Sequence, residues 1–366
     1  MKPPFRADHV GSLLRPAEIR NARESRAAGA LAADDLRRIE DRLIARAIDR
    51  QAEVGLMSAT DGEYRRAMWH FDFLEGLDGV EAFTAAHGIQ FEGGVETKPR
   101  GLKVTGKLGY SGHPMVDHFS YVRKTAKTTA KQTIPSPSVL HFRGGRKAVS
   151  EDVYPDMAEF YDDLAQAYQG AVLDFAGAGC RYLQLDETNL AYLCDPEQRA
   201  QLKARGDDPE VLPGVYARMI NASIAGRPDD MIVTMHLCRG NFRSSWISTG
   251  GYEPVADILF NEIRVDGYFM EFDSERAGDF EPLRLVPPGK KVVLELVTSK
   301  TGRLEDKDDI KRRIDDAARF VPLEQLCLSP QCGFASTEEG NLLNEDQQWA
   351  KLDMIVRIAE DVWGSA

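Results

Sequence analysis

The sequence predicts an α/β fold, a (β/α)8 barrel of the TIM type. Three observations support this prediction: short apolar runs recur along the chain, stretches with helical periodicity separate them, and eight such runs can be counted. Continuous apolar strands that alternate with helices are typical of a parallel sheet covered on both faces, and eight such units favour a closed barrel. A doubly wound open sheet is the structural alternative, but no G-x-G-x-x-G motif opens the first helix.

The expected helices are stretches in which apolar residues recur every three or four positions. The second of them stops at Gly177-Ala178-Gly179, because glycine ends helices readily. The helical stretches are residues 17–53, 154–178, 209–225, 252–263, 305–319 and 343–363.

The expected strands are the apolar runs between these helices, and most of them are followed at once by a polar residue. They are residues 8–11, 56–62, 138–140, 182–185, 232–235, 268–270, 292–297 and 326–329.

Residues 89–132 do not fit the alternation, because they are glycine-rich and basic with little helical period. The segment carries eight Lys and Arg residues. We expect an inserted hairpin and loop whose positive charge forms a solvated face; an electropositive lip that steers an anionic substrate is the functional alternative. With no repeat and no flexible linker, residues 1–366 are expected to form one domain.

Composition excludes several classes of protein. The chain has 46 Lys and Arg against 58 Asp and Glu, a net charge of −12, which works against non-specific binding of nucleic acid. No apolar run reaches the ~20 residues of a membrane span, and no signal peptide opens the chain. Five cysteines, an odd number, suit the reducing cytoplasm. Self-association into a homo-oligomer stays open.

Four residues that follow separate strands carry the chemistry of a metal site. His236, Cys238, Glu271 and Cys332 offer one nitrogen, two sulfurs and one oxygen. Functional side chains of a barrel gather where the strands end, and zinc accepts these donors in tetrahedral geometry. The alternative is a buried histidine and buried cysteines without a metal, which is the interpretation that we give to Cys180, Cys194 and Cys327.

The charge of this donor set indicates its chemistry. Zn²⁺ with two thiolates and one carboxylate sums to about −1, which makes a poor Lewis acid toward a carbonyl. Such a site suits holding an incoming thiol as a nucleophilic thiolate. Hydrolytic zinc sites use mainly histidine and carboxylate with a water. The donor set therefore favours alkyl transfer to a thiol over hydrolysis.

Several short segments resemble those of the cobalamin-independent methionine synthases, in a short form that is similar to their catalytic C-terminal barrel. They run in family order over most of the chain, and the tail segment Leu296–Gly302 is also similar. The segments are His9-Val10-Gly11-Ser12, Asp61-Gly62-Glu63-Tyr64-Arg65-Arg66, Leu185-Asp186-Glu187, Met235-His236-Leu237-Cys238, Met270-Glu271 and Ser329-Pro330-Gln331-Cys332-Gly333.

The resemblance implies a zinc-dependent methyltransferase that converts homocysteine to methionine. The methyl donor would be a 5-methyltetrahydrofolate or a simpler methyl carrier. The resemblance places Zn²⁺ on the four residues named above. It implies that Ser12 contacts the carboxylate of homocysteine, that Glu63 and Asp186 bind its ammonium, and that His9 belongs to the substrate site. Two carboxylates that face one cleft can hold one ammonium.

Two positions depart from the family, and both concern the methyl donor. Where the family has a histidine near the zinc, this chain has Val297-Thr298-Ser299, and where it has a tryptophan against the pterin, this chain has Leu140-His141-Phe142. Protonation of the leaving nitrogen is needed for methyl transfer from a pterin. The candidate acids are Asp186, Glu187, His141 and His9, and we expect Asp186 and His141 to be catalytic.

Three other functions stay open at this point. A zinc-dependent alkyltransferase could act on another thiol such as coenzyme M in epoxide opening, with arginines holding its sulfonate. These arginines would be Arg6, Arg15, Arg65 and Arg66. A zinc-binding or substrate-binding module would bind metal and thiol without turnover. A decarboxylase of the uroporphyrinogen type would share the barrel and need no zinc.

Overall fold

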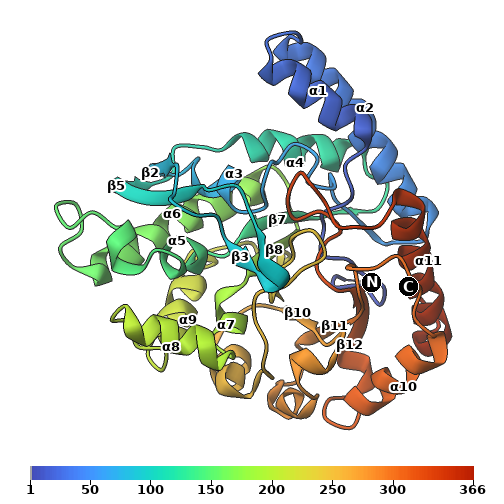
Figure 1. Cartoon of the computed structure of the whole chain (residues 1–366). Coiled ribbons are helices and arrows are strands. Elements are labelled where there is room, and N and C mark those ends of the chain that lie inside the picture. Colours follow the sequence, from blue (N-terminus) through green and yellow to red (C-terminus); the bar gives the residue numbers. More distant parts are fainter. Residues whose placement is uncertain (1) are drawn as a thin grey trace.

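Six parallel strands form the continuous part of the central sheet in the computed structural model, which describes residues 2–366 (Figure 1). Helices surround the sheet on its outer side. The strand order is β12–β11–β10–β9–β8–β7. The bounds are β7 (Gln132–Pro135), β8 (Tyr182–Glu187), β9 (Ile232–Leu237), β10 (Gly267–Glu271), β11 (Lys291–Val297) and β12 (Leu326–Pro330).

The remaining two barrel segments are short. β1 (Ser58–Ala59) pairs in parallel with β6 (Thr129–Ala130), which leads into β7. The N-terminal segment forms a single parallel bridge from Ala7 to Leu328 of β12. Together these segments supply eight parallel positions in chain order, and the predicted α/β barrel is confirmed.

The third predicted strand is wrong. Residues 138–140 lie in the short helix α5 (Ser138–Phe142), and the strand lies just before it, where Ile134 pairs with Leu185 of β8. A short apolar run fits a buried helix as well as a strand. Pro137, just before α5, has φ −61°, which suits the start of a helix.

The helices lie close to the predicted stretches, with two differences. The stretch 17–53 is two helices, because Gly29 with φ +75° breaks it. Figure 1 shows this pair projecting from the barrel. Residues 252–263 form only short 3-10 and π turns. The predicted helices appear as α1 (Ala17–Ala27), α2 (Ala33–Glu53), α6 (Met157–Gly177), α9 (Leu212–Ser223), α10 (Lys307–Ala317) and α11 (Glu345–Trp363).

Four further helices were not predicted individually: α3 (Phe71–Leu74), α4 (Pro114–Thr125), α7 (Asn189–Tyr192) and α8 (Pro196–Ala204). Proline opens both of the longer ones, and a side chain caps each start: His113 accepts from the Met115 amide, and Asp195 accepts from the Glu197 amide. No helix within residues 2–366 is both long and apolar enough to cross a membrane.

The insertion has different bounds from those expected for residues 89–132. It consists of two antiparallel hairpins, β2 (Asp78–Phe83) with β5 (Gly101–Gly109) and, between them, β3 (Gln90–Phe91) with β4 (Val95–Glu96). The chain then returns to the barrel through α4 and β6. The basic residues of this region do not form one lip, because most pair with separate carboxylates and Lys131 is buried inside the barrel.

Candidate functional site

The carboxyl ends of β8 to β12 place the polar residues beside one another. Register pairs Asp186 of β8 with His236 of β9, and Glu271 of β10 with Glu295 of β11. Cys238 follows β9 directly, and Cys332 follows β12 after one residue. All of these side chains are buried. Parallel strands end at one edge of the sheet, so residues far apart in the sequence meet there.

Three of the four predicted metal ligands come together. The ligand atoms of His236, Cys238 and Cys332 all lie within 4.8 Å of one another. The two sulfurs are 3.3 Å apart, and both cysteines are free thiols. This separation is far longer than a disulfide bond and close to the ~3.8 Å that two sulfur ligands of a tetrahedral zinc would have with Zn–S near ~2.3 Å.

The protonation of the two thiols differs, because they share a hydrogen bond. This bond to Cys332 lowers the pKa of Cys238 to about 6, against the opposing effect of burial. Burial raises the pKa of Cys332 well above its usual value. A soft metal ion needs the thiolate form as its ligand. The donor set of one imidazole and two thiols in a buried cluster therefore fits Zn²⁺.

Glu295 orients the histidine, and sequence analysis did not assign it a role. Its Oε1 lies 2.8 Å from Nδ1 of His236, on the opposite side of the ring from Nε2. Burial alone would lower the pKa of His236, but the Glu295 carboxylate and the Cys238 sulfur raise it well above its usual value. A metal-ligating histidine usually donates its other nitrogen to a carboxylate in this way. The available signal was an acid inside the apolar run 292–297.

Glu271, the fourth predicted ligand, lies beside the cluster without joining the group of three. Its Oε1 accepts from Sγ of Cys332 at 2.9 Å and from the Arg239 amide at 2.8 Å. Its Oε2 accepts from Gln331 at 2.7 Å and pairs with Arg276 at 3.1 Å. Burial opposes ionisation, but these partners together with Lys300 lower the pKa of Glu271 below its usual value.

The backbone after β12 is shaped to bring Cys332 against the first strand. Cys332 has φ +43°, a left-handed conformation that costs a non-glycine residue roughly 1–3 kcal/mol. A Cβ on the next residue, Gly333, would fall 1.7 Å from Oγ of Ser12. Only glycine allows this approach, so Gly333 and Ser12 lie side by side in the cavity wall and Cys332 lies directly behind them in the chain.

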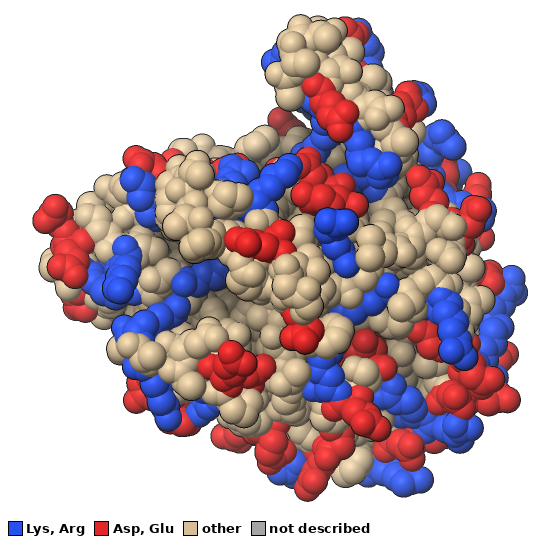
Figure 2. Space-filling view, viewed as in Figure 1, with Lys and Arg blue, Asp and Glu red and all other residues tan. Residues whose placement is uncertain are grey.

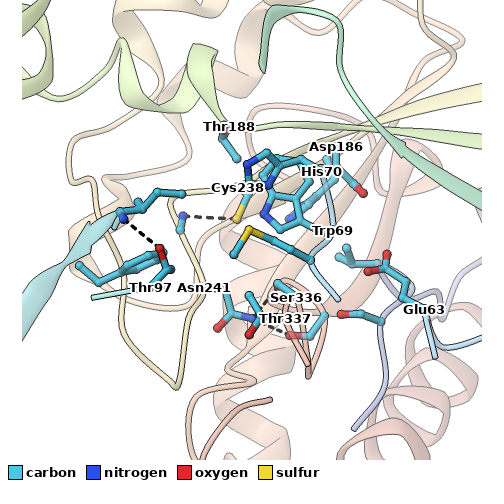
Figure 3. Close-up of a pocket in the computed structure, with 18 of the residues that line it drawn as sticks. Glu63, Trp69, His70, Thr97, Asp186, Thr188, Cys238, Asn241, Ser336 and Thr337 are labelled. Carbon is cyan, nitrogen blue, oxygen red and sulfur yellow. Dashed lines mark hydrogen bonds between the residues drawn. The ribbon is translucent and has the colours of Figure 1, made fainter. Parts of the chain in front are cut away.

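The predicted substrate residues Ser12, Glu63 and Asp186 line one cavity together with His236 and Cys238. Figure 3 shows Glu63, Asp186 and Cys238 around this space. Glu63 has one engaged oxygen, because Oε1 accepts from Thr133 at 2.8 Å and lies 3.3 Å from Arg66. The other oxygen, Oε2, is buried without a hydrogen-bond partner within residues 2–366. It is a free acceptor inside the cavity.

Asp186 is a buried carboxyl in this cavity whose pKa is shifted toward neutrality. Burial raises its pKa to about 7; His236 opposes the shift and Glu63 adds to it. One oxygen accepts from Gln184 at 2.7 Å. The group is therefore present in both protonation states near neutral pH.

The other candidate acids do not reach the cavity. His141 is buried between two tyrosines, with Nδ1 2.9 Å from Tyr216 Oη and Nε2 3.1 Å from Tyr161 Oη. Glu187 accepts from Ser138 and from the amides that begin α7. His9 is buried, and the residues that line the cavity on that strand are Val10 and Ser12. His141 and His9 thus lie outside the lining of this cavity, and their catalytic and substrate roles stay predictions.

Trp69 and His70 are cavity residues that sequence analysis missed. They follow β1 in a loop, and their rings are in contact with centroids 4.5 Å apart and planes tilted by 50° (Figure 3). The resemblance puts the family's tryptophan at the position of Leu140-His141-Phe142. The tryptophan that lines this cavity is instead Trp69. Only the pattern of aromatic residues after Arg66 offered a signal, and such a pattern is equally typical of a core helix.

Comparison with known proteins agrees with this geometry. The family model described as "Cobalamin-independent synthase, Catalytic domain" matches residues 5–360. The chain belongs to this family. A Bacillus subtilis protein named "Uncharacterized protein YxjH" is 53% identical over 364 residues, which cover 99% of this chain and 96% of that protein. The family supports a methyltransferase of the methionine synthase type.

Two solved structures share the barrel over nearly the whole chain. A putative vitamin-B12 independent methionine synthase from Listeria monocytogenes has 42% identity and a TM-score of 0.80, and the match covers 100% of both chains. A B12-independent methionine synthase from Shewanella sp. W3-18-1, in complex with selenomethionine, has 17% identity, a TM-score of 0.71 and coverage of 98% and 97%; it supports the fold alone.

A more distant relative is the 5-methyltetrahydropteroyltriglutamate–homocysteine methyltransferase of Shewanella oneidensis. It is 25% identical over 287 residues, which are 78% of this chain and 34% of that protein. The match thus leaves most of that relative without a counterpart in this chain.

Proposed function

We propose that the protein is a zinc-dependent methyltransferase that transfers a methyl group to the thiol of homocysteine and releases methionine. The observation that carries the proposal is the cluster of His236, Cys238 and Cys332 at the wall of a cavity that also contains Glu63 and Asp186. A thiol-activating centre and an ammonium-binding pair in one cavity fit an amino acid that bears a thiol.

The metal would be held by His236, Cys238 and Cys332, with Glu271 as the adjacent fourth donor. Zn²⁺ would lower the pKa of the acceptor thiol, so that the thiol is present as the thiolate. Glu295 keeps His236 in the required orientation and tautomer through Nδ1, 2.8 Å away. Glu271 is kept ionised by Arg239, Arg276 and Lys300.

The amino-acid part of the acceptor would be bound by three residues. Glu63 offers its free Oε2 to the ammonium, and burial makes this charge-assisted contact strong. Ser12 lies in the N-terminal segment, lines the same cavity and would offer its hydroxyl to the carboxylate. Asp186 lies next to His236 in register and completes the ammonium side.

The donor would be a methylated tetrahydropterin or a simpler methyl carrier. In the reaction the sulfur–carbon bond forms as the nitrogen–carbon bond breaks, and the leaving nitrogen takes up one proton. Among the candidate acids only Asp186 lines the cavity, and its pKa of about 7 lets it hold that proton at neutral pH. After donation, its carboxylate faces the bound ammonium.

The coenzyme M alternative loses its anion-binding residues. Arg6 and Arg15 donate to backbone carbonyls, Arg65 pairs with Asp41, and Arg66 contacts Glu63. None of the four lines the cavity. The acidic pair Glu63 and Asp186 would repel a sulfonate, so an amino-acid thiol is the better fit.

A product assay tests the proposal. Zinc-loaded protein is incubated with homocysteine and 5-methyltetrahydrofolate, as the monoglutamate and the triglutamate, and methionine is measured by mass spectrometry. We expect methionine from the wild type and none from Cys332→Ser. Zinc binding without methionine from any donor would favour a binding module, and methylation of coenzyme M in preference to homocysteine would favour the alternative substrate.

A further inference from the structure

A polar side chain, Gln184, lies within the apolar part of β8. Its neighbours Leu183 and Leu185 are buried, and Gln184 itself has no exposed surface. By contrast, Figure 2 shows Lys, Arg, Asp and Glu side chains spread over the outer face of the molecule. A buried amide costs free energy that an apolar side chain of similar size would not, so its hydrogen bonds call for an explanation.

The amide of Gln184 joins two separate segments of the chain. Its Nε2 donates to the carbonyl of Val10 at 2.8 Å and to Oδ1 of Asp186 at 2.7 Å. Both partners accept only, so both hydrogens of the amide are used. Its Oε1 is buried without a hydrogen-bond partner within residues 2–366. The side chain therefore keeps its two donated bonds at the cost of an unused acceptor, and the two oxygens that it connects give the reason for its presence.

The N-terminal segment that Gln184 contacts is held mainly by side chains. It forms one isolated parallel bridge, from Ala7 to Leu328, instead of a continuous ladder. Three successive carbonyls after this bridge each accept a hydrogen bond of 2.5 to 2.8 Å from a buried side chain of another segment. The pairs are His9 with Lys131, Val10 with Gln184 and Gly11 with Thr60. Because Ser12 follows directly, its position depends on these side chains.

Gln184 lies behind the wall of the first cavity, which Ser12 and Asp186 line. A second, wider cavity of about 710 Å³ shares Arg143 with the first, and its walls come from the hairpin β2–β5, the turn after α5 and α8. Gln184 lines neither cavity. Any effect of Gln184 on a ligand must therefore pass through the N-terminal segment and Asp186.

We propose that Gln184 is a positioning residue that sets the spacing between the two sides of the acceptor site, Ser12 for the carboxylate and Asp186 for the ammonium. The inference rests on the proposed function for these two roles. An α-amino acid carries both charged groups on one carbon atom, so two anchors act together only when their own spacing matches the ligand. One planar amide that holds Asp186 and the backbone two residues before Ser12 fixes that spacing.

The test measures binding of the product without turnover. Zinc-loaded protein is titrated in a calorimeter with methionine and with two analogues that each keep one charged group. These are 3-(methylthio)propylamine, which lacks the carboxylate, and 4-(methylthio)butanoate, which lacks the ammonium. In Gln184→Met, which keeps the length of the side chain and removes the donor, the Kd of methionine should rise about tenfold. The Kd of each analogue should stay within about twofold, because a ligand with one anchor does not depend on the distance between two.

A second variant covers the case in which Gln184→Met does not fold. Gln184→Asn keeps an amide but is one methylene shorter, so it cannot reach both oxygens. It should also weaken the binding of methionine more than the binding of either analogue. Zinc content is measured in each variant and should equal that of the wild type.

Gln325 provides a matched control at the other end of the strands. It directly precedes β12, and its Nε2 also donates two hydrogen bonds, to the carbonyls of Pro287 at 2.9 Å and Lys290 at 2.8 Å. Gln325 lines neither cavity. Gln325→Met should therefore keep the wild-type Kd for methionine and for both analogues.

Failure of the inference can be told apart from failure of the proposed function. An unchanged Kd of methionine in both Gln184 variants overturns the inference even if the wild type forms methionine from homocysteine. An equal rise in Kd for methionine and both analogues also overturns it, because it would assign Gln184 a general structural role. No binding of methionine by the wild type would reject the acceptor site and the inference together. A loss specific to methionine in a protein that makes no methionine would retain the inference and reject the methyltransferase.

Discussion

The two adjoining cavities are built in different ways. The first is formed by strand ends and loops: Glu63, Asp186 and Cys238 line it, Cys332 lies next to Cys238, and the lining residues run from Val10 to Thr337. The second is formed by an inserted hairpin, a turn and a short helix, and its charged lining residues are cations, three of which pair with carboxylates outside the lining. The strand ends of the barrel thus bring side chains from distant parts of the chain to one point, whereas the insertion adds a separate wall that is built from local hairpin contacts.

Removing the carboxylate of Glu295, which orients His236, should have the largest effect on the first cavity, a loss of zinc affinity. In Glu295→Gln the amide can no longer stabilise His236 through charge, and the affinity for zinc should fall about 10–100-fold. Competition with a metal chelator measures this. Wild-type zinc affinity in this variant would contradict the role of Glu295.

Removing the contact to the ammonium group should weaken the binding of homocysteine and leave the zinc content unchanged. Glu63→Gln loses the charge of its free Oε2, and the KM for homocysteine should rise about tenfold or more, since charge-assisted bonds contribute about 1.5–3 kcal/mol. Zinc content should be unchanged. Glu81→Gln, an exposed position on β2, is the control. Equal KM values in the two variants would remove Glu63 from the acceptor site.

Titration of Asp186 should act on binding and rate in opposite directions. Its pKa is raised to about 7, so the carboxyl gains a proton as the pH falls through that value and loses its charge. Affinity for methionine should therefore rise several-fold from about pH 6 to about pH 8, while kcat falls as the donor proton is lost. Asp186→Asn should flatten both profiles. Parallel profiles in wild type and variant would exclude Asp186 from both roles.

The sequence predicts the barrel and most of the first cavity because both follow from local patterns. A polar residue after an apolar strand must lie at the carboxyl edge, whatever its partners, and this placed His236, Cys238, Cys332 and Asp186 correctly. The same rule misplaced His141, because the short apolar run after Pro137 is a helix here and turns the imidazole toward Tyr161 and Tyr216.

The second cavity could not be predicted from local patterns. Its walls depend on how the hairpin β2–β5 packs near the turn that contains Arg143. The spacing of apolar residues, two in a strand and 3.6 in a helix, carries no information about such a contact between distant segments. The sequence favoured a solvated positive face for residues 89–132, with an electropositive lip as the alternative. Ion pairing does not separate the cations that line the cavity from the others. Arg100 and Lys103 line it and pair with carboxylates, and Lys98 and Lys107 pair with carboxylates outside it.

The central claim is that His236, Cys238 and Cys332 hold one zinc ion that serves the acceptor thiol. The most direct measurement is zinc stoichiometry by elemental analysis of purified wild type, Cys332→Ser and Cys194→Ser. Cys194 is buried outside the cluster and contacts the Leu190 carbonyl, so serine at that position controls for loss of a buried thiol. We expect about one zinc per chain in the wild type and in Cys194→Ser and almost none in Cys332→Ser. Equal zinc in all three proteins, or none in the wild type after zinc loading, would contradict the account.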